Sequence, residues 1–170
     1  MRNCLAIVLV CSSCGGSPVI SPFGADLGVN STWRREPHRG VDFAQHGLGE
    51  HVIAVLPGKV TKIRFVERYG WEVILEHQDF GRWTRYDHLA TVTVREGDLV
   101  ARGVIIGTTG LFWASAGTPH VHLELCLQIE CRDHMHFAGV EDPLEYSVGC
   151  YDPANHYGDR ALILTYPVEC

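Results

Sequence analysis

The chain has 170 residues, with 14 Lys and Arg against 20 Asp and Glu, so its formal net charge is −6. This length and the 46% hydrophobic content predict one domain with a buried core, and they exclude a disordered, collagen-like or coiled-coil chain. The acidic balance argues against nucleic acid as a partner, because phosphate binding needs clustered Lys and Arg. Ten histidines and seven cysteines direct attention to metal binding, acid–base chemistry and disulfides.

Residues 1–14 have the layout of a secretory signal peptide. Arg2 supplies a positive charge, Leu5–Val10 is a short apolar run, and small residues follow it. The run is much shorter than the roughly 20 apolar residues that a membrane-spanning helix needs. Cys14 follows two serines and resembles the lipid-accepting cysteine of a bacterial lipoprotein signal. We therefore expect export to the cell envelope or secretion, with membrane contact only through a lipid at Cys14.

Short strand-like segments separated by Gly and Pro turns follow. The predicted strands are His51–Leu56, Val60–Val66, Trp71–Glu76, Arg82–His88, Val92–Val94 and Val104–Ile106. Strands divided by turns at this spacing are typical of an antiparallel sandwich or barrel-like sheet, and no stretch shows an amphipathic helical period. The fold class is therefore predicted to be all-β.

One strand-like segment, residues 120–127, carries two histidines. Alternation places Val121 and Leu127 on the core face, and His120, His122 and Glu124 on the opposite face. Two imidazoles that are two residues apart on a strand share a face and are separated by two strand rises, about 6.6 Å. Such a pair can bind one metal ion together, or supply one ligand and one catalytic group, or simply line a solvated face.

A second histidine stands four residues before a carboxylate, in His38-Arg39-Gly40-Val41-Asp42. We expect Gly40 to give the backbone the freedom that brings both side chains to one point. Two His and one Asp suit a catalytic zinc ion that keeps its fourth position for water. The sequence lacks the H-E-x-x-H pattern of helix-borne zinc peptidases and the G-x-S-x-G pattern of serine hydrolases.

These segments, in this order, resemble the LytM/lysostaphin-type zinc metalloendopeptidases, which cut peptide bonds in bacterial peptidoglycan. The matching pieces are Ser21–Gly24, His38–Asp42, Val52–Val55, Gly58–Val60, Tyr86–Leu89, Gly97–Val100, Gly103–Gly107 and Gly117–Glu124. The resemblance covers roughly residues 21–146. It implies a zinc-containing groove and peptidoglycan peptides as the substrate.

Carried over to this sequence, the resemblance implies that His38, Asp42 and His122 bind Zn²⁺. His88 and His120 then share the acid and base roles. Strand alternation puts Thr84, Tyr86 and His88 on one face, which we expect to point His88 into the groove.

The remaining chain is expected to add little beyond this domain. Residues 147–170 are predicted to form a C-terminal extension packed on the domain, with Ala161–Tyr166 as an added strand. No linker or wall-binding segment is evident, and we expect a monomer.

Four cysteines remain if the signal peptide is cleaved and Cys14 is lipidated. Cys126, Cys131, Cys150 and Cys170 allow three pairings, or could stay free in the core. We favour Cys126–Cys131 with Cys150–Cys170, because the first would pin a short segment and the second would secure the tail.

Several other residues carry weaker signals. Glu124 is expected either to orient a ligand imidazole or to face solvent. Arg34 and Arg35 either contact a substrate carboxylate or occupy a loop. The four tryptophans, Trp33, Trp71, Trp83 and Trp113, line a groove or pack in the core. Surface positions are predicted for His46, His51, His77, His134, His136 and His156.

Two other functions remain open at this point. The chain could be a non-catalytic peptidoglycan-binding activator of another wall hydrolase, or a zinc peptidase with a substrate outside the wall. The bond cleaved is either D-Ala–diaminopimelate or a glycine bridge, and the former is favoured for a lipoprotein without a wall-binding module.

Overall fold

The computed structural model describes residues 17–28, 34, 36–112, 117–127, 131, 139–158 and 160–170. The predicted signal peptide with Cys14, and the predictions for Trp33, Arg35, Trp113, His134 and His136, lie outside these residues. Within the described part, no helix has the length and apolar character needed to cross a membrane.

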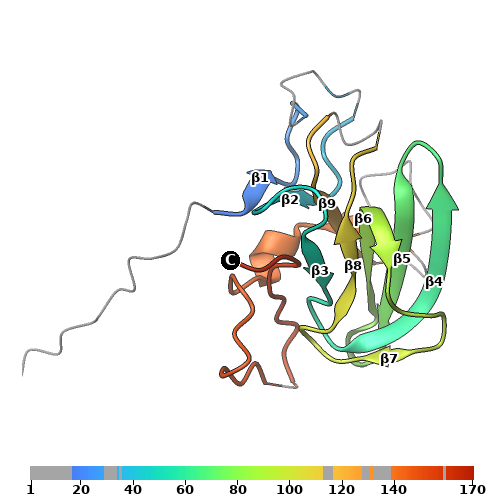
Figure 1. Ribbon diagram of the computed structural model, residues 1–170. Helices are drawn as coiled ribbons and strands as arrows, with labels where there is room; N and C mark the ends of the chain where they lie inside the picture. Colours follow the sequence, from blue (N-terminus) through green and yellow to red (C-terminus); the bar gives the residue numbers. More distant parts are fainter. Residues whose placement is uncertain are drawn as a thin grey trace, which may run out of the picture.

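The strands form one antiparallel sheet (Figure 1). The strands are β1 (Val19–Ser21), β2 (Val41–Phe43), β3 (His51–Ile53), β4 (Gly58–Val66), β5 (Gly70–His77), β6 (Arg82–Val92), β7 (Leu99–Val100), β8 (Ile105–Thr109), β9 (Val121–Cys126) and β10 (Val140–Glu141). The main path runs β1-β2-β9-β6-β5-β4-β7; β10 pairs with β9, and β8 pairs with both β3 and β6. Two short 3₁₀ helices, η1 (Gln78–Phe80) and η5 (Pro143–Tyr146), complete the described elements. The all-β prediction is confirmed.

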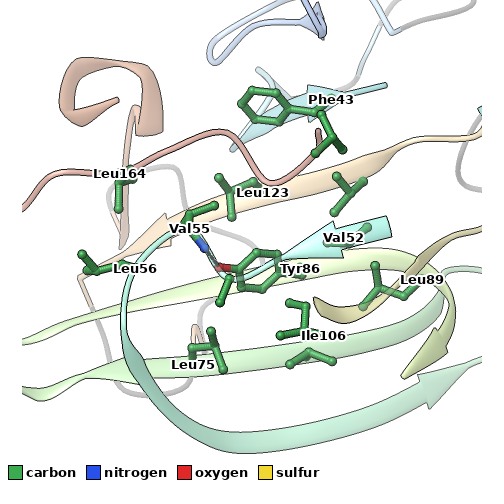
Figure 2. Close-up of a cluster of buried hydrophobic side chains, with 14 of the residues drawn as sticks. Phe43, Val52, Val55, Leu56, Leu75, Tyr86, Leu89, Ile106, Leu123 and Leu164 are labelled. Carbon is green, nitrogen blue, oxygen red and sulfur yellow. Dashed lines mark hydrogen bonds between the residues drawn. The ribbon is translucent and has the colours of Figure 1, made fainter. Parts of the chain in front are cut away.

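The hydrophobic core lies against one face of β9, β6 and β5, and is closed by β3, β8 and the C-terminal segment (Figure 2). Tyr86 lies at its centre and is fully buried, and its hydroxyl accepts a hydrogen bond from the backbone N–H of Val55 at 3.0 Å. Alternation along β9 sends Val121, Leu123 and Leu125 into this core. The opposite face of the same strands is therefore free to carry His122 and Glu124.

The C-terminal extension completes the core. Leu164 and Val168 are fully buried, and the N–H of Ile53 donates to the carbonyl of Pro167 at 2.8 Å. The predicted strand at Ala161–Tyr166 is wrong. Consecutive N–H groups there donate alternately to two different segments, to Tyr146 and Gly149 on one side and to Val55 on the other, and only an isolated bridge between Ser147 and Leu164 forms.

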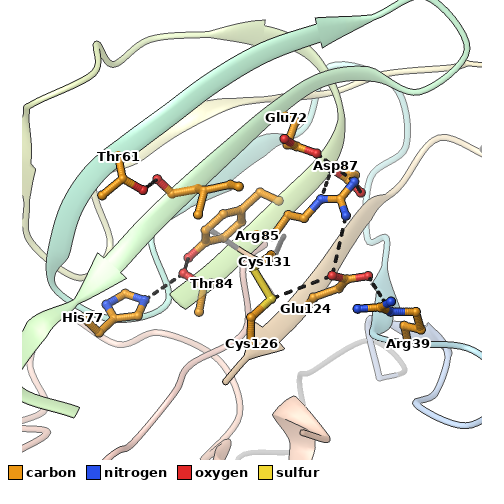
Figure 3. The surroundings of a disulfide bond; sticks show 12 residues. Arg39, Thr61, Glu72, His77, Thr84, Arg85, Asp87, Glu124, Cys126 and Cys131 are labelled. Atoms are coloured by element: carbon orange, nitrogen blue, oxygen red, sulfur yellow. Dashed lines mark hydrogen bonds and ion pairs between the residues drawn. A yellow bond between two sulfur atoms is a disulfide. The ribbon is translucent and has the colours of Figure 1, made fainter. Parts of the chain in front are cut away.

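Both favoured disulfides are confirmed, Cys126–Cys131 and Cys150–Cys170. The first joins the last residue of β9 to Cys131 (Figure 3). Both cysteines pack in a small cluster with Ile74 and Val140 on the face opposite the main core. Leu127 was expected to face the core, but it is 37% exposed because β9 ends at Cys126.

Candidate functional site

Three of the predicted site residues meet where β2 pairs with β9. Asp42 lies opposite His122 in the ladder, and His38 lies just before β2. Nε2 of His38 is 2.9 Å from Nδ1 of His122, and Oδ1 of Asp42 is 3.0 Å and 2.8 Å from these two nitrogens. His38 and Asp42 are buried. Three ligand atoms of the types that zinc prefers thus converge on one point.

Gly40 is needed here for space. A Cβ atom at this position would lie 2.3 Å from the carbonyl oxygen of Leu123 and 2.8 Å from Nε2 of His122. Its φ is not in the left-handed region, so the expected role of backbone freedom is wrong. The absent side chain lets the His38 loop lie against β9.

The hydrogen-bond partners of the two imidazoles indicate which nitrogen carries the proton. Nδ1 of His38 is 2.9 Å from the carbonyl of Pro22, which can only accept, so Nδ1–H donates and Nε2 keeps its lone pair. Both nitrogens of His122 have a carboxylate partner, since Nδ1 lies 2.8 Å from Oδ1 of Asp42 and Nε2 lies 3.4 Å from Oε1 of Glu124. With one proton, on Nε2 beside Glu124, His122 would turn its Nδ1 lone pair toward Nε2 of His38 and the Asp42 carboxylate. Such a set of acceptors fits a cation, and its composition fits zinc.

The pKa values of the three groups reflect this crowding. Burial raises the pKa of Asp42, but the hydrogen bond with His122 and the interaction with the nearby His38 outweigh burial and hold that pKa well below its usual range. Burial lowers the pKa of His122, yet the hydrogen bonds to Asp42 and Glu124 dominate and raise it to about 10. Burial lowers the pKa of His38. The raised pKa of His122 shows that this group favours a positive charge at the point where the three side chains meet.

His120 and His88 lie beside this group. Nε2 of His120 is 3.6 Å from Oδ1 of Asp42, and the His88 ring centroid is 4.9 Å from that of His120. Nδ1 of His120 is bonded to the carbonyl of Thr118 at 2.7 Å, and Nδ1 of His88 to the carbonyl of Tyr69 at 2.9 Å. Burial lowers the pKa of both, in the case of His88 to about 3. Both imidazoles are therefore neutral at neutral pH, and each has an acceptor nitrogen at Nε2.

His88 reaches the site by a different route from the one predicted. Thr84 and Tyr86 point into the core, so regular alternation would have buried His88 there as well. The ladder between β5 and β6 shifts register between the pairs Val73–Tyr86 and Trp71–Leu89, and His88 has a φ of 66°. This bulge turns His88 to the site face and returns Leu89 to the core. A positive φ at a non-glycine residue is a strained conformation of the kind that gathers at functional sites.

Other sequence predictions have mixed outcomes. Glu124 is buried beside His122 instead of facing solvent. Arg34 pairs with Oδ2 of Asp42 at 3.2 Å. Trp71 and Trp83 pack against the hydrophobic clusters. His46, His51 and His156 are exposed as expected.

His77 is the exception, because it is 2% exposed and continues the core face of β5 after Val73 and Leu75. A second possible metal group, Glu124 with Cys126 and Cys131, has no free thiolate because the two cysteines are joined.

Sequence reasoning missed a group of charged residues behind the site. Glu72, Arg85 and Asp87 are buried and lie on the same sheet face as Glu124 (Figure 3). Their signal was present in β6, where Arg85 and Asp87 alternate with the core residues Thr84 and Tyr86. Charged residues are rarely fully buried unless they are paired, and the alternation in β6 does not reveal that Arg85 and Asp87 have buried partners.

Comparison with known proteins assigns this chain to a defined family. The model of peptidase family M23 matches residues 36–134. The peptidoglycan DD-endopeptidase ShyB of Vibrio cholerae is 36% identical over 104 residues, covering 61% of this chain and 24% of ShyB. The chain spans about a quarter of the length of the curated relatives it matches.

Two solved structures share the fold. The structure of LytU superposes with a TM-score of 0.61 at 26% identity, covering 77% of this chain and 84% of LytU. The SpoIIQ–SpoIIIAH pore-forming complex contains a chain that matches with a TM-score of 0.59 at 28% identity, covering 75% of this chain and 81% of that one.

Proposed function

Because the chain belongs to peptidase family M23, we propose that it is a zinc-dependent endopeptidase that hydrolyses peptide bonds of bacterial peptidoglycan. One observation carries this proposal. Two imidazole nitrogens and one buried carboxylate meet within 3.0 Å, with two further neutral histidines beside them. A shared metal ion accounts for the convergence of these three ligand atoms on one point.

His38 Nε2, His122 Nδ1 and Asp42 Oδ1 would hold the metal ion. A bound zinc ion lowers the pKa of a coordinated water to about 7 and polarises a carbonyl oxygen. Asp42 would be the single anionic ligand, so a zinc ion held here would keep a net positive charge, which favours the developing oxyanion of the scissile peptide bond. Arg34, at 3.2 Å from Asp42, adds to this positive potential.

His88 and His120 are proposed to move the protons. Their carbonyl-bound Nδ1 atoms fix the rings, and their Nε2 atoms are the acceptors on the site side. Either can accept a proton from the attacking water. The imidazolium formed is a strong acid because burial disfavours its charge, so the proton passes readily to the leaving amine. We assign the base and acid roles to the two jointly.

The substrate is proposed to be a cross-link or stem peptide of peptidoglycan. ShyB and ShyA, each 36% identical to this chain over about 100 residues, are named peptidoglycan DD-endopeptidases. This supports the D-Ala–diaminopimelate bond over a glycine bridge. Such a substrate lies outside the cytoplasm, which agrees with the export signal predicted at residues 1–14 and with a lipid at Cys14. We assign the peptidase domain to residues 21–146, the packed extension to residues 147–170, and a monomeric state to the protein.

The test is a dye-release assay on purified, dye-labelled sacculi with metal-loaded protein, chelator-treated protein and protein reloaded with zinc. We expect release by the first, loss of release after chelation and recovery with zinc. Cross-linked muropeptides and glycine-rich peptides offered in parallel separate a wall-specific peptidase from one with another protein substrate. Metal-loaded protein that releases nothing from either would contradict the proposal.

One observation favours a second function, that of a non-catalytic assembly or activator module. The chain of the SpoIIQ–SpoIIIAH pore-forming complex has the same fold, so the fold also occurs in a structural assembly. The same assay distinguishes the two functions, because an activator would bind sacculi and release dye only when a second hydrolase is added.

A further inference from the structure

Arg85 is the centre of a buried ionic group on the site face of the sheet (Figure 3). Its Nη2 lies 2.7 Å from Oε2 of Glu72 and 2.8 Å from Oδ2 of Asp87, and its Nε donates to Oδ1 of Asp87 at 3.0 Å. Its Nη1 lies 3.7 Å from Oε2 of Glu124. One guanidinium, on a residue that is 9% exposed, therefore lies next to three buried carboxylates on three neighbouring strands.

The strand register connects this ionic group to the metal-ligand set. Arg85 lies opposite Glu124 across the β6–β9 ladder, and Asp87 lies opposite His122. Side chains directly opposite each other in a ladder interact most strongly. Glu124 uses Oε2 toward Arg85 and Oε1 toward Nε2 of His122 at 3.4 Å. The carboxylate of Glu124 thus stands between the guanidinium and the imidazole.

This position has a consequence for His122. An imidazole offers Nδ1 to a metal only when the proton stays on Nε2, and an acceptor at Nε2 selects that tautomer and the ring orientation. Glu124 is that acceptor, but its contact with His122 is long and its side chain has other rotamers available. The positive charge of Arg85 attracts Oε2 of Glu124 and so keeps Oε1 of the same carboxylate beside Nε2 of His122.

We propose that Arg85 is a positioning residue for the metal site, acting on His122 through Glu124; this rests on the proposed zinc-dependent function. Arg39 assists from the other side, with its Nε 3.7 Å from Oε1 of Glu124. Lysine cannot replace Arg85, because its single ammonium lacks the planar fork that reaches Asp87 with two nitrogens and Glu124 with a third.

The experiment measures the zinc dissociation constant of the full chain by competition with a chromogenic chelator. The variants are Glu124→Gln, Arg85→Lys and the double variant. Arg82→Lys is the matched control, because Arg82 lies on the same strand and pairs with Glu141 at 2.8 Å, outside the Arg85 group. Spectra of the cobalt-substituted proteins report the geometry of the ligands independently of activity.

We expect Glu124→Gln to weaken zinc binding about 10- to 100-fold, the range typical of a lost partner behind a metal ligand. Arg85→Lys should weaken it about 3- to 10-fold and change the cobalt spectrum, and Arg82→Lys should change neither. Since Arg85 acts through Glu124, the double variant should bind zinc no more weakly than Glu124→Gln alone. Additive losses would overturn the proposal and indicate a merely structural ion pair.

Two further outcomes decide the remaining cases. If Arg85→Lys does not fold, Glu72→Gln loosens the 2.7 Å contact while leaving Arg85 in place, and wild-type zinc affinity in that variant would overturn the proposal. If the wild-type protein binds zinc and the variants show the same zinc affinity and cobalt spectra, the positioning role of Arg85 is overturned while the proposed function stands. Wild-type protein that binds no zinc would overturn the proposed function as well.

Discussion

Histidines are buried on both faces of the sheet, but their ring nitrogens have different kinds of partner on each face. On the core face, Nδ1 of His77 bonds to the carbonyl of Pro57 and Nε2 bonds to the hydroxyl of Thr84, each at 2.8 Å. On the site face, His38 and His122 each have one nitrogen held by an acceptor, while their other nitrogens lie 2.9 Å apart beside Asp42. Both nitrogens of His77 thus have partners within the core, whereas Nε2 of His38 and Nδ1 of His122 face each other and one carboxylate oxygen.

This difference separates structural from functional burial. A buried polar group is stable when its partners satisfy it, and a group of converging acceptors is costly until something positive binds. Burial alone therefore does not identify the site, since His77 is as buried as His38. What identifies the site is the partner of the second ring nitrogen of each histidine, which is a hydroxyl for His77 and another ligand atom for His38.

The largest expected effect is loss of the metal. His122→Ala removes a ligand atom from the centre of the acceptor group, so the protein should retain no zinc after desalting and should not release peptides from sacculi. His77→Ala, on the core face, should still bind one zinc ion per chain despite a lower melting temperature. Zinc measured by mass spectrometry checks both. Stoichiometric zinc in His122→Ala would contradict the assignment.

Loss of activity without loss of metal is expected for His120→Ala. The side chain lies beside the ligands but is not assigned as one, so the zinc content should equal that of the wild type. Sacculus cleavage should fall about 10²- to 10⁴-fold, the usual contribution of an acid–base group. His46→Ala, at an exposed position, is the control. Cleavage at the wild-type rate by His120→Ala would remove its proposed role.

The core face predicts a pH effect on stability. Burial lowers the pKa of His77 from 6.5 to about 4, so the unfolded chain binds its proton more readily than the folded one. The stabilisation is complete above pH 6.5 and is lost as the pH falls toward 4. The contribution of His77 to the free energy of unfolding changes by about 3 kcal/mol across this pH range. Urea unfolding of metal-free wild type and His77→Asn across this range should show a shallower pH dependence in the variant, and equal slopes would be inconsistent with the network.

A smaller effect is expected from the disulfide behind the site. Cys126 and Cys131 are five residues apart, and closing so short a loop restricts the unfolded chain by about 2 kcal/mol in the chain-entropy description. The paired substitution Cys126→Ala with Cys131→Ala should lower the free energy of unfolding by that amount under oxidising conditions. Chemical denaturation measures it, and unchanged stability would show that the bond adds no constraint.

The sequence predicted the parts that depend on local pattern. Turn residues and alternation located β4 and β5 to within two residues at each end, and the segments around His38, His88 and His120 identified the residues that the fold brings together. The prediction for β6 ended at His88, but the strand continues to Val92 and replaces the separate strand predicted at Val92–Val94. The parity argument for His88 was wrong, because a bulge inverts alternation and no local residue type announces it.

The rest required tertiary information. Gly40 matters through the approach of Leu123, 83 residues further along the chain, which no local pattern reveals. Arg85 contacts partners on β5 and β9, so its role depends on the pairing of strands that are distant in sequence. His77 was assigned to the surface although it continues the core face of β5, because a polar residue at a strand end is more often exposed.

The most direct test of the central claim is mass spectrometry of sacculi digested by the zinc-loaded protein in water enriched in ¹⁸O. We expect new peptide fragments in which each carboxylate formed at a cut amide bond carries one ¹⁸O atom. These fragments should be absent after digestion with His122→Ala or with chelator-treated protein. Sacculi that bind the zinc-loaded protein but yield no labelled carboxylates would contradict the central claim.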